Sequence, residues 1–337
     1  MYMQRCIDLA LQGAGRVAPN PMVGAVLVYQ NRIIGEGYHT AYGAAHAEVE
    51  ALRAVTPENR HLIPLSTLYV NLEPCAHRGK TPPCTNLILE HRIQTVVVGQ
   101  TDPNPLVSGK GISILRAAGL DIHTGILEQA CEQLNKRFNT YHRLKRPYII
   151  LKWAQTADGF IATENGRRES ISDHTSQIIL HQWRGQEQSI LIGYRTALLD
   201  NPSLNVRLCK GNHPIRLVID YENMLPRHLN LFDGSIPTYI FTTSSKRQHN
   251  DKILDKDRLY PSFMDELYKL SIQSVLVEGG AALHQQLVSE QLWDEARVFQ
   301  SPMYLGAEQG VQAVSLKGSP AETHTLNKDK LLIYFNS

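Results

Sequence analysis

The sequence has little net charge, few cysteines and no long hydrophobic run, and each absence excludes a class of protein. Thirty-four basic and 32 acidic residues leave a formal charge of +2, so we expect no sequence-wide attraction to nucleic acid or to an anionic membrane. No run of about eighteen apolar residues occurs, which predicts that no helix spans a membrane. The five cysteines are odd in number and widely spread, so they do not form the disulfide framework of a small secreted protein.

The N-terminus lacks the charged and then apolar segments of a secretory signal, which predicts a cytoplasmic protein. In that reducing compartment, cysteines that matter are usually metal ligands or nucleophiles. Of the 337 residues, 42% are apolar and 20% are charged, which is typical of a folded globular protein. At about 150 residues per domain, the length predicts two domains. The basic stretch at residues 143–147 is the expected boundary, which gives domains 1–145 and 146–337.

Helical and extended patterns alternate along both halves of the chain. In the first half, we expect helices at residues 3–14, 46–55, 84–91, 111–118 and 128–141, and strands at residues 22–28, 67–72, 95–99 and 121–123 with another starting at Ile33. In the second half, we expect strands at residues 148–153, 189–193, 215–220, 238–242, 274–278, 295–300 and 330–335, and helices at residues 174–184, 264–270 and 281–289. This alternation predicts an α/β fold. The second half should have a doubly wound, mostly parallel sheet with an antiparallel edge, and a polar surface loop at residues 244–257.

The strongest chemical signal lies in the first half, where His46 and Glu48 share one segment, Cys75 follows a proline and Cys84 comes later. One histidine and two cysteines suit zinc, with a fourth position left open for water. At such a site, zinc lowers the pKa of a bound water toward neutrality. Glu48 can reach that water without binding the metal, and this arrangement of His-x-Glu and Pro-Cys is typical of zinc nucleobase deaminases. We therefore predict a catalytic zinc ion held by His46, Cys75 and Cys84, with Glu48 moving the proton.

Simpler interpretations of the same residues stay open. A histidine and a glutamate at this spacing also occur on helix surfaces without a metal, and cysteines also occur as inert thiols in a hydrophobic core. A closed structural zinc site needs a fourth protein ligand, for which His77 is the nearest candidate. The loop between Cys75 and Cys84 is longer than in nucleic-acid deaminases. It carries three basic side chains beside a glycine, which favours a cradle for the phosphate of a small substrate. We interpret the remaining cysteines, Cys6, Cys131 and Cys209, as structural or neutral.

These residues lie within longer motifs that resemble one known family. In chain order, the motifs are Pro19-Asn20-Pro21-Met22-Val23-Gly24, Gly35-Glu36-Gly37-Tyr38-His39, His46-Ala47-Glu48, the run from Glu73 to Cys84, and Asp102-Pro103-Asn104-Pro105. They cover most of residues 1–130 and resemble the N-terminal half of the bifunctional riboflavin-biosynthesis deaminase–reductases. The resemblance implies a cytidine-deaminase-like αβα fold and hydrolytic deamination of a diaminopyrimidinone that carries a ribose phosphate. It also implies that this substrate is held by Asn20, His77, Lys80, Asp102 and Asn104.

The second half continues the resemblance through Leu151 to Gly159, Trp183-Arg184, Gly193, Thr196 to Arg207 and Val277 to Gly280. These segments resemble the family's reductase domain, which is similar to dihydrofolate reductase. The resemblance implies that NADPH reduces the opened ribose to a ribityl chain. It implies substrate contacts by Lys152, Arg168, Arg184, Leu204, Arg207 and Glu278. It implies NADPH contacts by Ala154, Ser170, Thr196, Asp200, Gly279, Gly280, Ala281 and Ala282.

Physical arguments also support some of these predicted contacts. Gly279 and Gly280 follow a predicted strand and precede a predicted helix, so backbone amides there can face a diphosphate. The dinucleotide fingerprint of a Rossmann domain is absent. The guanidinium groups of Arg184 and Arg207 have the fork geometry that suits a phosphate.

The sequence departs from the family pattern just before Ile171, where Arg168 and Ser170 stand in place of the usual serine and tryptophan. Tyr221 stands where a small residue near the cofactor is usual. These departures leave open an active deaminase with a degenerate reductase domain that serves only as a scaffold. A nucleic-acid-editing deaminase is a second alternative, although the near-neutral charge, the long cysteine loop and the second domain argue against it. A non-enzymatic, zinc-stabilised binding protein is a third, and an exchangeable water on the zinc would exclude it.

We therefore expect a bifunctional cytoplasmic enzyme, both a zinc-dependent aminohydrolase and an NADPH-dependent oxidoreductase. It should perform two consecutive steps of riboflavin synthesis. Its expected cofactors are Zn²⁺ and NADPH. Its expected partners are a small phosphorylated pyrimidine substrate and further copies of itself in a homo-oligomer, with no nucleic acid and no membrane.

Overall fold

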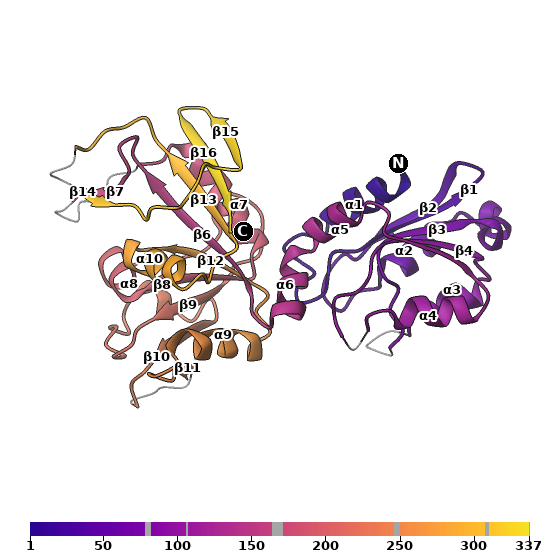
Figure 1. The fold of residues 1–337 in the computed structure, drawn as a ribbon, viewed down its shortest axis with the longest axis horizontal. Helices are drawn as coiled ribbons and strands as arrows, with labels where there is room; N and C mark the ends of the chain where they lie inside the picture. Colours follow the sequence, from indigo (N-terminus) through magenta and orange to yellow (C-terminus); the bar gives the residue numbers. More distant parts are fainter. Residues whose placement is uncertain (78–81, 106, 164–170, 246–249, 307–309, 337) are drawn as a thin grey trace. The chain divides into compact units, whose positions relative to one another are not determined.

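The computed structural model describes residues 1–77, 82–105, 107–163, 171–245, 250–306 and 310–336. Within these ranges the chain forms two compact units, unit 1 (Met1–Lys145) and unit 2 (Arg146–Ser337), shown in Figure 1. None of the helices in these ranges combines the length and the apolar character that crossing a bilayer requires.

Unit 1 is built on a five-stranded sheet within the described residues, in the order β2-β1-β3-β4-β5. β1 is antiparallel to both of its neighbours, whereas β3, β4 and β5 run parallel. The elements of unit 1, in chain order, are α1 (Tyr2–Leu11), β1 (Gly24–Tyr29), β2 (Arg32–Tyr38), α2 (Ala47–Arg53), the 3-10 helix η1 (Pro57–Leu65), β3 (Thr67–Leu72), α3 (Cys84–Glu90), β4 (Thr95–Gln100), α4 (Lys110–Ala117), β5 (Asp121–Thr124), α5 (Glu128–Leu134) and α6 (Lys136–Leu144).

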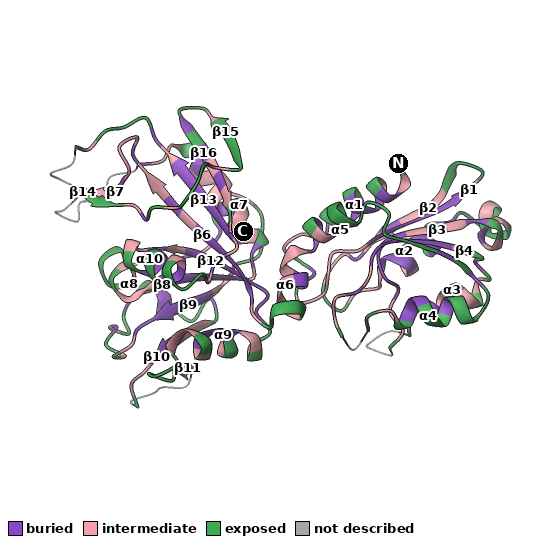
Figure 2. Ribbon diagram, in the orientation of Figure 1, coloured by how far each residue is buried: buried purple, intermediate pink, exposed green. Residues whose placement is uncertain are grey.

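Both faces of this sheet are covered by helices because its strands are apolar on both sides. On β1, Ala25 and Leu27 belong to a buried cluster that includes α2, α3 and α4, whereas Val26 and Val28 belong to a second cluster that includes α1 and α5. The two clusters lie on opposite faces because side chains alternate along a strand. Figure 2 shows the strands buried between the helices. The result is a three-layer αβα unit, which confirms the fold expected from the resemblance.

Two local features of unit 1 differ from the sequence prediction. The sequence predicts one helix over residues 128–141, whereas the structure has α5 and α6 separated at Asn135, whose backbone leaves the helical region (φ −100°, ψ 22°). The Asn135 side chain accepts a hydrogen bond from the backbone N–H of Met22 and donates one to its carbonyl oxygen. This tertiary contact interrupts the helix. The 3-10 helix η1 has no counterpart in the prediction, because its sequence lacks apolar residues at helical spacing.

Unit 2 contains a nine-stranded sheet within the described residues, in the order β11-β10-β9-β8-β12-β6-β13-β16-β15, and a separate two-stranded sheet, β14-β7. The elements, in chain order, are β6 (Tyr148–Gln155), β7 (Phe160–Thr163), α7 (His174–Gln186), β8 (Ser189–Gly193), α8 (Tyr194–Asp200), β9 (Ile215–Ile219), the 3-10 helix η2 (Asn230–Phe232), β10 (Thr238–Thr242), β11 (Asp251–Ile253), α9 (Leu259–Lys269), β12 (Ser274–Gly279), α10 (Ala281–Ser289), β13 (Glu295–Gln300), β14 (Gly310–Gln312), β15 (Glu322–Leu326) and β16 (Asp329–Phe335).

The large sheet is parallel from β11 to β13 and antiparallel at β16 and β15, which confirms the predicted doubly wound sheet with an antiparallel edge. Its central strands present different faces to different helices. Leu151 of β6 packs with residues of α9 and α10, whereas Ile150 packs with Trp183 of α7. By the same alternation, Lys152 on β6 and Glu278 on the adjacent β12 face α7. The strand period therefore brings two charged residues to one side of the sheet.

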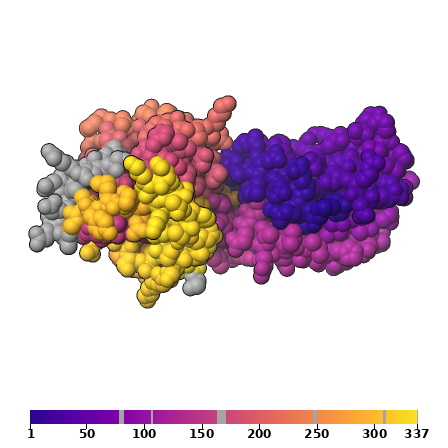
Figure 3. All heavy atoms as spheres, turned by 90° about the horizontal axis from the view of Figure 1, so that it is seen from above, coloured from indigo at the N-terminus to yellow at the C-terminus, as the bar shows by residue number. Residues whose placement is uncertain are grey.

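The predicted polar surface loop at residues 244–257 is partly wrong. It contains β11, which pairs in parallel with β10, and Asp251 at its start is buried. Burial of this carboxylate is possible because Asn223 donates a hydrogen bond to it at 2.8 Å. The sequence also does not predict α8, β7, β14 or β15. β15 is mostly exposed at the surface of unit 2 (yellow in Figure 3), and it lacks the apolar alternation on which strand prediction depends.

Candidate active sites

Three side chains from separate segments of unit 1 meet in one group. His46 Nδ1, Cys75 Sγ and Cys84 Sγ all lie within 4.8 Å of one another. His46 immediately precedes α2, Cys84 is the first residue of α3, and Cys75 follows β3. The His46 nitrogen is 3.2 Å from the sulfur of Cys84 and 3.6 Å from that of Cys75. One nitrogen and two sulfurs at this spacing fit a zinc ion.

The local electrostatics of the group also fit a metal. A hydrogen bond from the Cys84 thiol lowers the pKa of Cys75, and the backbone N–H of Cys84 donates to the same sulfur at 3.3 Å. The lowered pKa favours the thiolate form of Cys75, which is the form that binds zinc. Among the described residues the group contains no fourth ligand, and His77, the candidate for closing a structural site, is not part of it. This leaves one coordination position for water, as a catalytic zinc site requires.

Glu48 lies beside this group without belonging to it. It is the second residue of α2 and only 3% exposed. Burial raises the pKa of Glu48, and the charges of Cys75 and His46 also act on it, so the carboxyl group is close to the ligands. A buried carboxyl group with a raised pKa next to a water position is suited to accept and return a proton.

The side-chain amide nitrogen of Asn20 is hydrogen-bonded within the protein. Asn20 Nδ2 is 3.0 Å from His39 Nε2, and His39 Nδ1 is 2.9 Å from the carbonyl oxygen of Ala45. Because a carbonyl only accepts, His39 carries its proton on Nδ1, and its Nε2 accepts from Asn20. Among the described residues no group donates to the Asn20 amide oxygen, so this oxygen can accept a hydrogen bond from a substrate. His39 is the last residue of the motif that begins at Gly35, but the sequence alone indicates no role for it.

Asp102 and Asn104 lie in the segment that follows β4. Asp102 is buried and accepts a hydrogen bond from the backbone N–H of Asn104 at 2.8 Å. Burial raises the pKa of Asp102 to about 6, and the charges of Glu73 and His77 act on it as well. His77 itself is exposed. Because β3 and β4 are parallel, the segments after them emerge at the same edge of the sheet, which is where Cys75 also lies.

Glu73 holds this segment in place, and sequence reasoning missed it. Its carboxylate accepts hydrogen bonds from four backbone N–H groups, those of Asp102, Gly109, Gly111 and Ile112, at 2.9–3.3 Å. Two of these donors lie in the first turn of α4, where backbone N–H groups lack partners within the helix. An acidic residue directly after a buried strand was the available signal.

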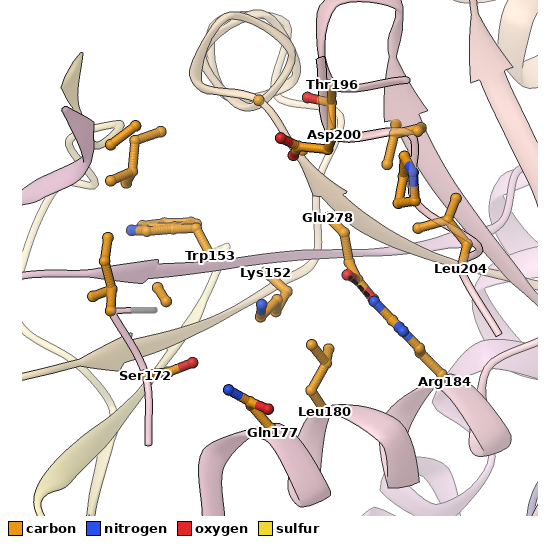
Figure 4. A pocket seen from close by; sticks show the side chains of 18 of the residues that line it. Lys152, Trp153, Ser172, Gln177, Leu180, Arg184, Thr196, Asp200, Leu204 and Glu278 are labelled. Carbon is orange, nitrogen blue, oxygen red and sulfur yellow. Dashed lines mark hydrogen bonds and ion pairs between the residues drawn. The ribbon is translucent and has the colours of Figure 1, made fainter. Parts of the chain in front are cut away.

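In unit 2, a pocket of about 570 Å³ opens on the α7 side of the sheet (Figure 4). Ten residues implied by the resemblance line it: Lys152, Ala154, Arg184, Thr196, Asp200, Leu204, Arg207, Glu278, Gly279 and Gly280. Two others, Ala281 and Ala282, begin α10 beyond its lining. The remaining candidates, Lys80 of unit 1 and Arg168 and Ser170 of unit 2, lie outside the described residues.

A buried ion pair forms one wall of the pocket. Arg184 of α7 donates to both carboxylate oxygens of Glu278, at 2.6 and 2.7 Å, and its third nitrogen donates to the carbonyl oxygen of Asn205 at 3.1 Å. Burial opposes ionisation of Glu278, but the charge and hydrogen bonds of Arg184, together with the charge of Lys152, lower the pKa of that carboxyl group. Lys152 lies nearby, with its Nζ 5.7 Å from the ring centre of Phe299, and burial lowers its pKa. The nitrogens of Arg184 are thus engaged within the protein, so its predicted contact with a phosphate stays a prediction.

The turn between β12 and α10 is packed closely against α8. A Cβ on Gly279 would lie 3.1 Å from two side-chain atoms of Thr196, and one on Gly280 would lie 3.2 Å from Thr196 Oγ1. Glycine at both positions therefore keeps the turn in contact with Thr196 and leaves its backbone open to the pocket. The N–H groups of the first turn of α10 lack intrahelical partners and suit a phosphate. These features fit the diphosphate of a dinucleotide cofactor such as NADPH.

The chain matches known families in both units. Residues 1–100 match the cytidine and deoxycytidylate deaminase zinc-binding region, and residues 147–332 match the RibD C-terminal domain. Riboflavin biosynthesis protein RibD of Bacillus amyloliquefaciens is 40% identical over 330 residues, which cover 94% of this chain and 88% of the relative. The protein of the same name from Aquifex aeolicus is 35% identical over 350 residues, covering 99% and 97%. The chain belongs to the RibD family.

Solved structures agree with this membership. A diaminohydroxyphosphoribosylaminopyrimidine deaminase/5-amino-6-(5-phosphoribosylamino)uracil reductase from Thermotoga maritima is 36% identical, with a TM-score of 0.89 and coverage of 98% of this chain and 97% of that one. RibD of Acinetobacter baumannii is 30% identical, with a TM-score of 0.91 and coverage of 99% and 97%.

Membership in the RibD family confirms several expectations. The protein is a bifunctional enzyme of riboflavin biosynthesis, with a zinc-dependent deaminase and an NADPH-using reductase. The nucleic-acid-editing and non-enzymatic alternatives are therefore set aside. The alternative of a degenerate, scaffold-only reductase domain is not supported either, since unit 2 matches the family's reductase domain and keeps a pocket with the expected residues.

Proposed function

We propose that unit 1 removes an amino group from a diaminopyrimidinone ribose phosphate, and that unit 2 then reduces the ribosyl group of the product to a ribityl chain. The observation that carries the proposal is the group of His46, Cys75 and Cys84 with the buried Glu48 beside it. The pocket around Lys152 and Glu278 supports the second step.

In unit 1, His46, Cys75 and Cys84 would hold the zinc ion. When bound, zinc makes a water molecule acidic enough to attack a ring carbon at neutral pH. The Glu48 carboxylate accepts the proton of the attacking water and delivers it to the departing amino nitrogen. The ring carbon thus exchanges its amino group for a carbonyl oxygen, and ammonia leaves. The Asn20 amide oxygen and the segment with Asp102 and Asn104 orient the base and the ribose phosphate.

In unit 2, Thr196, Asp200, Gly279 and Gly280 would hold NADPH, which supplies the hydride when bound. The chain's own contribution is position and charge. Arg184 keeps Glu278 ionised and fixes the direction of its carboxylate toward the pocket. Lys152 and Glu278, from adjacent strands, lie within the pocket and orient the sugar (Figure 4).

A cytoplasmic location and a homo-oligomeric state are also part of the proposal. Metal-binding thiols such as Cys75 and Cys84 stay reduced in the cytoplasm, which supports the location. The preference of soluble enzymes for closed symmetric assemblies supports the oligomer. Light scattering during gel filtration measures the mass in solution, and a mass of one chain would contradict the oligomer.

The function is tested by supplying the diaminopyrimidinone ribose phosphate with and without NADPH and identifying the products by mass spectrometry. We expect release of ammonia in both reactions and a ribityl product only with NADPH. Absence of ammonia would contradict the assignment of unit 1. Ammonia release without a ribityl product in the presence of NADPH would contradict the assignment of unit 2.

A further inference from the structure

One face of α7 forms a wall of the reductase pocket. Gln177, Leu180, His181 and Arg184 line the pocket at successive spacings of three, one and three residues, which places them on a single helical face. Figure 4 shows the side chains of Gln177, Leu180 and Arg184 rising from this helix into the pocket. His181 carries the one imidazole on this face, and neither the family resemblance nor the proposed chemistry uses it.

The structure fixes the tautomer of His181. The backbone N–H of Arg207 donates a hydrogen bond to His181 Nδ1 at 3.2 Å. A backbone N–H only donates, so Nδ1 carries no proton, and the neutral ring must carry its proton on Nε2. Burial, together with the charges of Arg184 and Arg207, lowers the pKa of His181 to about 4, which is consistent with a neutral ring.

The Nε2–H group of His181 is an unused donor. No group in the described part of the chain accepts a hydrogen bond from it, although the residue is only 3% exposed. Nε2 is also not among the described side-chain atoms that are both fully buried and without a partner, so it remains accessible from the pocket. A buried histidine with one nitrogen fixed by the backbone and the other open to a pocket is arranged to contact a ligand.

The charges around His181 indicate what that ligand carries. Arg184 and Glu278 neutralise each other. Among the described lining residues this leaves the cations Lys152 and Arg207 and one carboxylate, Asp200, which the resemblance places at the cofactor. The Arg207 guanidinium is exposed, with one nitrogen 3.3 Å from the side-chain oxygen of Asn205. Positive charge beside a neutral N–H donor suits the oxygens of a phosphate group.

We infer that His181 is a substrate-binding residue of the reductase, whose Nε2–H donates to the phosphate of the ribosylaminopyrimidine substrate beside Arg207. This inference rests on the proposed reduction in unit 2. It adds a neutral donor to a site in which Arg184, the arginine expected from the sequence, is engaged with Glu278.

Two substitutions separate this role from a purely structural one. In His181→Asn, the amide oxygen can replace Nδ1 as the acceptor for Arg207, but the donor at the Nε2 position is lost. In His181→Gln, the amide nitrogen can reach the Nε2 position, but the acceptor for Arg207 is lost. If His181 contacts the phosphate, His181→Asn should weaken substrate binding by about ten- to a hundredfold, the range for a hydrogen bond to a charged group. His181→Gln should keep most of the affinity.

The measurements are the KM of the deaminated substrate, the KM of NADPH, and the Kd of the deaminated substrate without NADPH, obtained by calorimetry on the full chain. We expect His181→Asn to raise the first and third and to leave the KM of NADPH unchanged. With the dephosphorylated substrate, wild type and His181→Asn should bind equally. If His181→Gln is the weaker variant, or if the defect persists without the phosphate, the inference is overturned and His181 only holds the backbone of Arg207. Failure of the wild type to oxidise NADPH would instead overturn the proposed function.

Discussion

The two active sites use their charged residues in different ways. In unit 1, the ligand atoms are the nitrogen of His46 and the sulfurs of Cys75 and Cys84, which lie close together and suit a bound metal ion. Glu48 lies beside them. In unit 2, Arg184 and Glu278 satisfy each other, and the pocket depends on that pair for its shape and its charge. A metal site requires particular residue types as ligands, whereas this pocket wall requires that two charged side chains pair with each other. The first site should therefore fail when its ligands are changed, and the second when a pair is broken.

The largest expected effect is removal of the zinc ligands in unit 1. The double substitution Cys75→Ser and Cys84→Ser should reduce the zinc content from one per chain to none, because a serine hydroxyl stays protonated and binds zinc poorly. Ammonia release should become undetectable. NADPH oxidation with already deaminated substrate serves as the control and should persist. Elemental analysis and the two assays measure these outcomes, and full retention of zinc would show that the ligands were misassigned.

The next largest effect is expected from breaking the buried pair in unit 2. Arg184→Ala leaves the Glu278 carboxylate buried without its partner, which should lower the free energy of unfolding by about 3–5 kcal/mol. Reductase activity should fall with it. Lys269→Ala is the matched control, because Lys269 pairs with Glu266 at the surface, and such pairs contribute about 0–1 kcal/mol. Denaturant unfolding of both variants measures the difference, and equal losses would contradict the structural role given to the buried pair.

A smaller effect is expected from Glu73→Gln in unit 1. The amide replaces one acceptor oxygen with a donor that faces backbone N–H groups, so about half of the hydrogen bonds to the segment after β4 are lost. We expect the deaminase kcat/KM to fall by about ten- to a hundredfold, equivalent to about 1.5–3 kcal/mol. The defect should lie mainly in KM, because the segment carries Asp102 and Asn104 rather than the metal. Zinc content should not change, and loss of zinc would show that Glu73 supports the metal group instead.

The smallest effect is expected from Arg207→Ala, since this side chain is exposed and water screens its charge. The KM for the phosphorylated reductase substrate should rise about tenfold, or about 1.4 kcal/mol. Raising the salt concentration should weaken substrate binding to the wild type more than to the variant. Unchanged reductase kinetics would place the phosphate elsewhere in the pocket.

The difference between the two sites also explains how much the sequence could predict. The zinc site was predictable because a histidine and two cysteines in this order, with a glutamate at the position of Glu48, are typical of few sites other than a catalytic zinc site. The parallel sheet of unit 2 was predictable because helical and extended patterns alternate along the chain, whereas the αβα fold of unit 1 was expected from the family resemblance. The pairing of Arg184 with Glu278 was not, because it joins α7 to β12 across 94 positions of sequence. The tautomer of His181 was not predictable from the sequence either, because it depends on a hydrogen bond from the backbone N–H group of Arg207.

The same reason applies to the local errors in the fold. The break at Asn135 comes from its contact with Met22, 113 residues earlier, and buried Asp251 depends on a hydrogen bond from Asn223. Local patterns contain no information about such distant partners. His39 and Glu73 were visible within motifs, but only the structure shows that one orients Asn20 and the other fixes the segment after β4.

The central claim is that one chain holds two active sites with independent chemistry, and Glu48→Gln tests it most directly. Glutamine keeps the shape of the side chain but cannot accept and return a proton, so ammonia release should fall by about 10⁴-fold, the upper end for general acid–base catalysis. Zinc content should stay at one per chain, and NADPH oxidation with deaminated substrate should stay at the wild-type rate. Ammonia release near the wild-type rate, or a collapse of NADPH oxidation together with deamination, would contradict the account.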